Sequence, residues 1–219
     1  MLYSVFIALL LSINAWAAPP AQAVVQTLPK EDTRKVLLVF GDSLSAGYGV
    51  PPGQSYPDDL QRKLDAQGYA WRVVNLGISG DTTSGGLARV NTGVALRPSL
   101  VLLELGGNDG LRGLPLPMTR ENLEQMIGAF QRVGARIVLA GMTLPPNYGP
   151  DYIRSFEAIY TGLAAKYKLA LIPFLLQDIA TRDMRYFQRD GIHPTAEGAQ
   201  IVSDTVLRAI KPLLGAARN

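Results

Sequence analysis

Five short apolar runs recur along the chain, separated by longer stretches that mix apolar and polar residues. Each run is nearly continuous in aliphatic and β-branched residues, which is typical of strands buried on both faces of a parallel sheet. We therefore expect strands at 35–40, 71–76, 100–105, 136–140 and 169–172.

Several of the intervening stretches carry apolar residues at helical spacing, such as Leu60 and Leu64, one turn apart. Thr195 is the expected N-cap of the last helix, which has Glu197 in its first turn. Alternating strands and helices with right-handed crossovers predict a doubly wound, flavodoxin-like α/β sheet. The five expected helices cover 56–67, 82–96, 120–133, 152–167 and 195–214.

The composition of the chain says little more about the fold, but it excludes several kinds of functional site. A chain of 219 residues, 47% apolar and 18% charged, suits one globular domain, and a net charge of +3 is too mild to indicate a nucleic-acid partner. The absence of cysteine excludes a thiol nucleophile, a disulfide framework and a zinc–thiolate site. His193 is the only histidine, so a multi-histidine metal centre is impossible and His193 is the natural general base near neutral pH.

Residues 1–23 carry no charged side chain and combine an apolar stretch with small-residue triplets that end at Ala17 and Ala23. This pattern predicts a secretory signal peptide cleaved after one of these alanines, and the apolar stretch is too short for a spanning helix. Residues 24–34 are expected to be a lead-in segment and 35–219 a single domain. We expect a periplasmic or secreted protein without a stable membrane anchor.

A doubly wound sheet binds ligands at the carboxyl ends of its strands. Ser43 lies there, three residues after the first predicted strand, in the segment Gly-Asp-Ser-Leu-Ser-Ala-Gly. A glycine at this point permits a sharp exit from the strand, and a following helix start can aim backbone N–H groups at one point. Taken alone, Ser43 is equally well interpreted as part of a helix cap, because serine needs a neighbouring base to act as a nucleophile.

That base can be His193, which stands immediately before the last predicted helix. Asp190 precedes it by three residues, across a glycine, so the turn can bring the carboxylate back to the imidazole Nδ1. The alternative is a surface histidine at a helix start with an Asx-type turn.

Two further glycine-rich loops follow the second and third predicted strands. The first contains Gly80, whose N–H can donate into the same crevice, and the second contains Asn108, whose amide can donate to a developing oxyanion. Each loop alone is compatible with an ordinary turn. Together with Ser43, Asp190 and His193, both loops are expected to meet at one edge of one sheet.

These segments identify a resemblance to the SGNH (GDSL) hydrolases, and within them to bacterial periplasmic thioesterases, lysophospholipases and arylesterases. The narrower likeness rests on ELGGNDGLRGLP at 104–115 and LPPNYG at 144–149, and one departure is the segment GVPP at 49–52. The family's four blocks occur in order as GDSLSAG at 41–47, NLGISGDT at 75–82, LGGND at 105–109 and DGIHP at 190–194.

The resemblance implies a three-layer α/β/α sandwich around a five-stranded parallel sheet. It also implies a serine esterase or thioesterase that hydrolyses aryl esters, acyl-CoA or lysophospholipids through an acyl-enzyme. No metal or cofactor is implied, and we expect a monomer that acts on small acyl substrates. The implied roles are Ser43 as nucleophile, His193 as base, Asp190 as its orienting carboxylate, and Ser43, Gly80 and Asn108 as oxyanion donors.

The acyl group needs an apolar groove. Segments 111–118 and 142–148 follow the third and fourth predicted strands, so we expect Leu114, Leu144 and Pro145 to line the groove. We also expect the 110–118 or the 142–150 loop to move on binding. Two alternatives stay open. A carbohydrate acetylesterase of the same fold would prefer acetylated xylan to longer acyl esters, and a flavodoxin-like binding module would lack activity and so lose none on Ser43→Ala.

Overall fold

The computed structural model describes residues 32–217, so the predicted signal peptide, its cleavage sites and all but the last residues of the lead-in segment lie outside the described residues. The five predicted strands are present, each within one residue of its predicted ends, and all pair in parallel in the order β2-β1-β3-β4-β5. This arrangement confirms the predicted α/β class. The strands are β1 (Lys35–Gly41), β2 (Trp71–Asn75), β3 (Leu100–Glu104), β4 (Arg136–Ala140) and β5 (Ala170–Ile172).

The central strands are buried on both faces, as their continuous apolar runs predict. In β1 every residue after Lys35 is buried, and all five residues of β3 are buried. The chain reverses its direction of progress across the sheet between β1 and β3, which are neighbours although β2 separates them in sequence. That reversal creates the crevice in which doubly wound folds bind their ligands.

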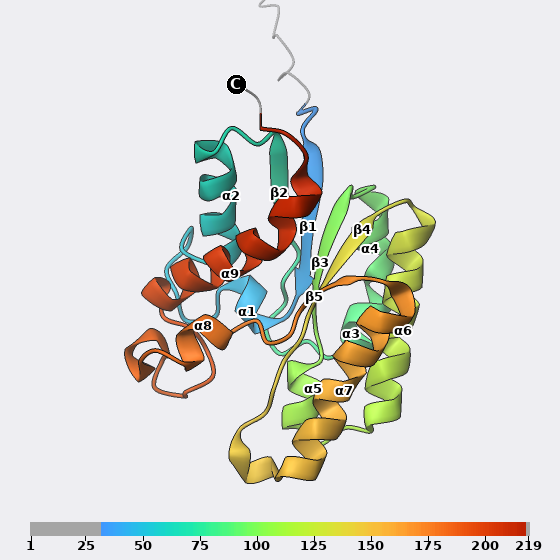
Figure 1. The fold of residues 1–219 in the computed structure, drawn as a ribbon, viewed down its shortest axis with the longest axis vertical. Coiled ribbons are helices and arrows are strands. Elements are labelled where there is room, and N and C mark those ends of the chain that lie inside the picture. Colours follow the sequence, from blue (N-terminus) through green and yellow to red (C-terminus); the bar gives the residue numbers. More distant parts are fainter. Residues whose placement is uncertain (1–31, 218–219) are drawn as a thin grey trace, which may run out of the picture. The chain divides into compact units, whose positions relative to one another are not determined.

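Helices cover both faces of the sheet and complete three layers (Figure 1). The helices α2 (Tyr56–Ala66) and α9 (Ala196–Leu214) lie on one face. The opposite face carries α3 (Thr83–Ala88), α4 (Val90–Ala95), α6 (Leu116–Arg132) and α7 (Pro150–Tyr167). No helix of the described part of the chain has the length and apolar character needed to cross a membrane.

The structure corrects several predicted helix boundaries. The helix expected over 82–96 is broken at Arg89, whose ψ of 9° ends α3 before α4 begins. Helices α6 and α7 begin earlier than expected because Pro117 and Pro150 occupy their first turns, where a missing N–H costs no hydrogen bond. Five short elements were not predicted: α1 (Ser43–Ala46), α5 (Gly107–Leu111), α8 (Gln177–Ala180), and the 3₁₀ turns η1 (Pro146–Tyr148) and η2 (Met184–Tyr186).

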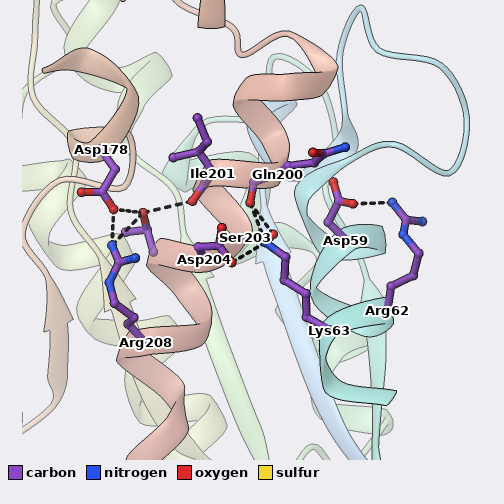
Figure 2. A network of polar contacts seen from close by, with 10 residues as sticks. Asp59, Arg62, Lys63, Asp178, Gln200, Ile201, Ser203, Asp204 and Arg208 are labelled. Atoms are coloured by element: carbon purple, nitrogen blue, oxygen red, sulfur yellow. Dashed lines mark hydrogen bonds and ion pairs between the residues drawn. The ribbon is translucent and has the colours of Figure 1, made fainter. Parts of the chain in front are cut away.

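Polar contacts fix α9 against its neighbours (Figure 2). Lys63 of α2 donates to Gln200 O at 2.8 Å and forms an ion pair with Asp204. On the other side, Asp178 of α8 accepts a hydrogen bond from Thr205 at 2.6 Å and pairs with Arg208. Because α9 is held on two sides, the loop that precedes it is anchored at its C-terminal end.

Candidate active site

Ser43 is the first residue of α1, at the carboxyl end of β1. The helix cap is Asp42, whose Oδ1 accepts a hydrogen bond of 3.0 Å from the Leu44 N–H. A Cβ on Gly41 would lie 2.2 Å from Ser45 Oγ and 2.3 Å from Glu104 Oε2, so only glycine fits at the exit from the strand. The capping role therefore belongs to Asp42 and leaves the Ser43 hydroxyl available.

The Ser43 hydroxyl contacts the only imidazole of the chain. His193 Nε2 lies 2.9 Å from Ser43 Oγ, and His193 Nδ1 lies 2.7 Å from Asp190 Oδ2. A base in contact with the serine and a carboxylate behind the base form the arrangement that activates a serine nucleophile.

Asp190 is held as a carboxylate by its own turn. Its Oδ1 accepts hydrogen bonds from the N–H groups of Ile192, at 2.9 Å, and His193, at 3.0 Å. Partial burial alone would raise the pKa of Asp190, but these two bonds and the His193 ring hold that pKa below its usual value. The imidazole thus faces a negative charge that favours its Nδ1–H tautomer and stabilises the imidazolium.

Two other segments, which carry Asn108 and Gly80, meet beside the Ser43 turn. Asn108, in α5, donates from Nδ2 to Asp42 Oδ2 at 3.1 Å and to Asp81 O at 2.9 Å. It therefore bridges the residue before Ser43 and the residue after Gly80. Gly80 has a φ of +81°, a conformation that L side chains rarely adopt, and its carbonyl accepts a hydrogen bond from Arg112 at 3.0 Å.

The loop that carries Gly80 is clasped by Arg89. Its guanidinium binds Asp81 Oδ2 at 2.7 Å, Leu76 O at 2.8 Å and Gly41 O at 2.9 Å. One partly buried cation thereby joins the ends of β1 and β2 to the Gly80 loop. Because Arg89 also breaks the predicted helix over 82–96, this clasp accounts for the interruption.

A buried pair of carboxyl groups lies under the Ser43 turn. Glu104 ends β3, and its Oε2 accepts hydrogen bonds from the Asp42 N–H at 3.1 Å and from Ser45 Oγ at 2.7 Å. Burial raises the pKa of Asp42 to about 6, although hydrogen bonds from Leu44 and Asn108 oppose the rise. Burial and the neighbouring Asp42 raise the pKa of Glu104 well above its usual value.

An apolar cavity of about 300 Å³ opens beside these groups. Leu144 and Pro145 line it, as do Gly107, next to Asn108, and Ile192, next to His193. Leu114 is not among the lining residues, and its backbone N–H instead donates to Asp109 O at 3.0 Å. The rest of the wall comes mainly from Met142, Thr143, Pro146, Phe174, Leu176, Met184 and Phe187.

The structure thus brings Ser43, Asp190 and His193 into direct contact, with Asn108 beside them and Gly80 in the adjoining loop. A group of three or more residues able to hold a metal ion is not found within residues 32–217. The arrangement suits covalent acyl transfer, because it offers a nucleophile, a base and N–H donors beside an apolar cavity.

Sequence reasoning missed two residues that build the site. Glu104 had a visible signal, since a carboxyl in a run expected to be buried on both faces needs an explanation. Arg89 had no comparable signal, because its three acceptors are backbone or side-chain oxygens of distant segments.

Comparison with known families agrees with the sequence motifs. Residues 39–201 match the family described as the GDSL-like Lipase/Acylhydrolase family. The curated Esterase TesA of Pseudomonas aeruginosa is 43% identical over 189 residues, which cover 85% of this chain and 93% of that protein. The thioesterase 1/protease 1/lysophospholipase L1 of Escherichia coli K12 is 37% identical over 179 residues, covering 81% of this chain and 84% of that protein.

A solved structure agrees with this family at the level of the fold. The crystal structure of TesA matches with a TM-score of 0.79 and 44% identity, over 82% of this chain and 100% of that one. The predicted resemblance and fold are therefore confirmed.

Proposed function

Because the chain belongs to the GDSL-like lipase/acylhydrolase family, we propose that it is a serine hydrolase that cleaves carboxylic esters and acyl thioesters. The observation that carries the proposal is the chain of contacts from Ser43 Oγ to His193 Nε2, at 2.9 Å, and from His193 Nδ1 to Asp190 Oδ2, at 2.7 Å. A protein that only binds a ligand has no need of a base held against a serine.

In the proposed reaction His193 Nε2 takes the Ser43 proton as Oγ attacks the acyl carbonyl. The negative charge that develops on the carbonyl oxygen is held by the N–H groups of Ser43 and Gly80 and by the Asn108 amide. The imidazolium, stabilised by Asp190, then gives its proton to the leaving alcohol or thiol. Water, deprotonated by the same imidazole, hydrolyses the acyl-enzyme and regenerates Ser43.

The amide of Asn108 must change partners during this cycle. Both hydrogens of Nδ2 are engaged in the free protein, one by Asp42 Oδ2 and one by Asp81 O. The hydrogen on the Asp81 side faces the loop that carries Gly80. We propose that this hydrogen serves the oxyanion, while the bond to Asp42 keeps the amide in place.

The substrate class follows from the cavity and from the relatives. The walls of the cavity are almost entirely aliphatic or aromatic, and the cavity lies beside Asn108 and His193. Such a cavity suits an acyl chain longer than acetyl. The relatives are named as an esterase and as a thioesterase 1/protease 1/lysophospholipase L1. We propose aryl esters, acyl-CoA and lysophospholipids as substrates, with no requirement for a metal or cofactor.

The decisive experiment is a chain-length series of p-nitrophenyl esters and acyl-CoAs, run on wild type and on Ser43→Ala. Since burying one methylene is worth roughly 0.8 kcal/mol, kcat/KM should rise about fourfold per methylene until the cavity is filled. Ser155→Ala, an exposed serine on α7, is the matched control and should behave as wild type. Equal activity of Ser43→Ala and wild type would end the proposal, and a preference for acetyl xylan would favour the carbohydrate esterase.

The cavity itself is tested by Leu144→Asp. A charge in its wall should raise KM for long-chain esters more than for acetyl esters, because only the long chains enter the cavity. Equal effects on both esters would separate Leu144 from acyl binding.

Export and oligomeric state complete the proposal. The uncharged residues 1–23 support secretion to the periplasm or beyond, and N-terminal sequencing of the exported protein should begin at Ala18 or Val24. The contacts among Ser43, His193 and Asp190 are complete within one chain, so the proposed reaction requires no second copy. We propose a monomer, and sedimentation at assay concentration would test it. An unprocessed N-terminus in the exported protein would contradict the first statement.

A further inference from the structure

Of the buried carboxyl pair under the Ser43 turn, only Asp42 has a role in the reaction described above, and Glu104 has none. Asp42 is 3% exposed and Glu104 is fully buried. Within the described residues, the hydrogen-bond donors to Glu104 are a backbone N–H and the Ser45 hydroxyl, neither of which is a cation. Two negative charges so close together in a buried site cannot both persist, so the pair must keep at least one proton.

The hydrogen bonds indicate which residue keeps that proton. Both oxygens of Asp42 act as acceptors, Oδ1 from the Leu44 N–H and Oδ2 from the Asn108 amide. In Glu104 both hydrogen bonds go to Oε2, and Oε1 is buried with no hydrogen-bond partner among residues 32–217. Glu104 Oε1 is therefore fully open to a proton, whereas each oxygen of Asp42 already accepts a hydrogen bond.

The second oxygen of Asp42 connects this pair to the site. Asp42 Oδ2 is 3.1 Å from Asn108 Nδ2, the nitrogen whose other hydrogen points to Asp81 O. A full negative charge at Oδ2 holds one amide hydrogen firmly, because a charged acceptor roughly doubles the strength of such a bond. The amide plane is then fixed, and its second hydrogen remains on the side of Gly80.

We propose that Glu104 is a positioning residue: it retains a proton, so that the single negative charge of the pair lies on Asp42, where it orients the Asn108 amide for the oxyanion. The inference rests on the proposed hydrolase function. The pKa directions agree with it, since burial and the Asp42 charge both raise the pKa of Glu104.

Other ionisable groups around the pair do not supply a competing charge. Tyr56 of α2 lies 2.7 Å from Ser45 Oγ and continues the chain of hydroxyls, and Tyr160 of α7 donates to Leu105 O at 3.0 Å. Burial raises the pKa of both phenols well above the usual value, so both stay neutral. His193 favours the Asp42 charge through space, and Arg89 is directed at Asp81 and backbone carbonyls.

The first test compares Glu104→Leu with Glu104→Gln. Leucine removes the polar partner of Asp42, so the Asn108 amide should lose its orientation and kcat should fall about 10²-fold, the cost of one oxyanion donor, with little change in KM. Glutamine is neutral, like the protonated acid, and its amide oxygen can accept from the Asp42 N–H and from Ser45 Oγ as Oε2 does, so it should recover at least a tenfold part of that loss. Equal loss in both variants, or full activity in Glu104→Leu, would overturn the proposal.

Leu103→Ala is the control for destabilisation alone, because Leu103 precedes Glu104 in β3 and is equally buried. It should lower Tm without lowering kcat of the folded enzyme.

The second test does not depend on activity or on Glu104→Leu folding. Infrared difference spectra of wild type against Glu104→Gln at neutral pH should show one protonated carboxylic acid band that the variant lacks. A wild-type spectrum without that band would overturn the proposal. If the protein were not an esterase, Ser43→Ala would change no activity while the band would still be present, so the two failures are distinguishable.

Discussion

The two halves of the candidate site are built in different ways. The Ser43 half lies at the ends of buried strands, where Asp42 is 3% exposed and Glu104 fully buried. The His193 half lies on an irregular and largely exposed segment before α9, where the Asp190 side chain is 38% exposed. One half depends on the packing of the core and the other on a short turn held by its own hydrogen bonds.

The contrast is clearest in the two aspartates. Burial raises the pKa of Asp42 to about 6, whereas hydrogen bonds from the backbone and His193 outweigh partial burial and lower the pKa of Asp190. The same residue type is thus tuned in opposite directions. We infer that the exposed half can be altered at little cost in stability and a large cost in rate, while changes in the buried half affect both.

The largest expected effect is that of His193→Ala. Loss of the only base should lower kcat by about 10⁴–10⁶-fold, as removal of a triad histidine does elsewhere. Tm should stay close to the wild-type value, because His193 lies on the exposed segment and its ring contacts are Ser43, Asp190 and the half-exposed ring of Tyr48. A large drop in Tm would show that this half also supports the core.

Asp190→Asn should have the next largest effect. An amide keeps the size of the side chain but cannot stabilise the imidazolium or select the Nδ1–H tautomer, so kcat should fall by about 10⁴-fold. The measurement is kcat for one ester across the pH range, with Asp183→Asn as a control on the same exposed segment. A loss below about tenfold would mean that the turn, and not the carboxylate, orients His193.

Asn108→Ala moves the test to the buried half. Removing one oxyanion donor typically lowers kcat by about 10²–10³-fold with little change in KM, and we expect that split here. Tm should fall as well, because Asn108 bridges Asp42 and Asp81. Asn91→Ala, an exposed position of α4, is the matched control, and a change in KM alone would remove Asn108 from the oxyanion site.

The sequence predicts the two halves unequally well. The strands are evident because short continuous apolar runs are typical of strands buried on both faces of a sheet. Ser43, Asp190 and His193 are evident because they lie beside glycine turns at strand or helix ends. The details of the buried half are harder to predict, since Glu104 binds the Asp42 N–H 62 residues away in sequence. Only the parallel pairing of β1 with β3, which places Gly41 opposite Glu104, brings these groups together.

Arg89 and Leu114 also show that local sequence pattern does not predict tertiary contacts. The helical pattern over 82–96 contains no signal for the break at Arg89, because its cause is a set of acceptors at the ends of β1 and β2. Leu114 follows β3 as expected, yet the local turn after α5 directs its backbone to Asp109 and leaves it outside the cavity wall. Local pattern places residues near a strand end, and tertiary contacts decide which of them line the site.

The smallest expected effect concerns folding stability, because the contributions of Asp42 and Asp190 to stability should change with pH in opposite directions. Asp42 binds its proton more tightly in the folded state than in the unfolded chain, so its contribution to stability is present below the unfolded pKa of 3.8 and is lost as pH rises through about 6. Between about pH 4 and about pH 7, Asp42→Asn should therefore gain stability relative to wild type, on the order of 2 kcal/mol.

Asp190 has the opposite sign. Its folded-state pKa is lowered, so its contribution is present above the unfolded pKa and is lost as pH falls through the folded value. Asp190→Asn should therefore lose stability relative to wild type as pH rises through the acidic range. Urea unfolding of the three proteins at each pH measures both differences, and their extrapolated free energies can be compared pairwise. If both variants moved in the same direction, burial would not be what distinguishes the two halves, since desolvation of Asp42 is the one cause that makes its charge costly in the folded protein.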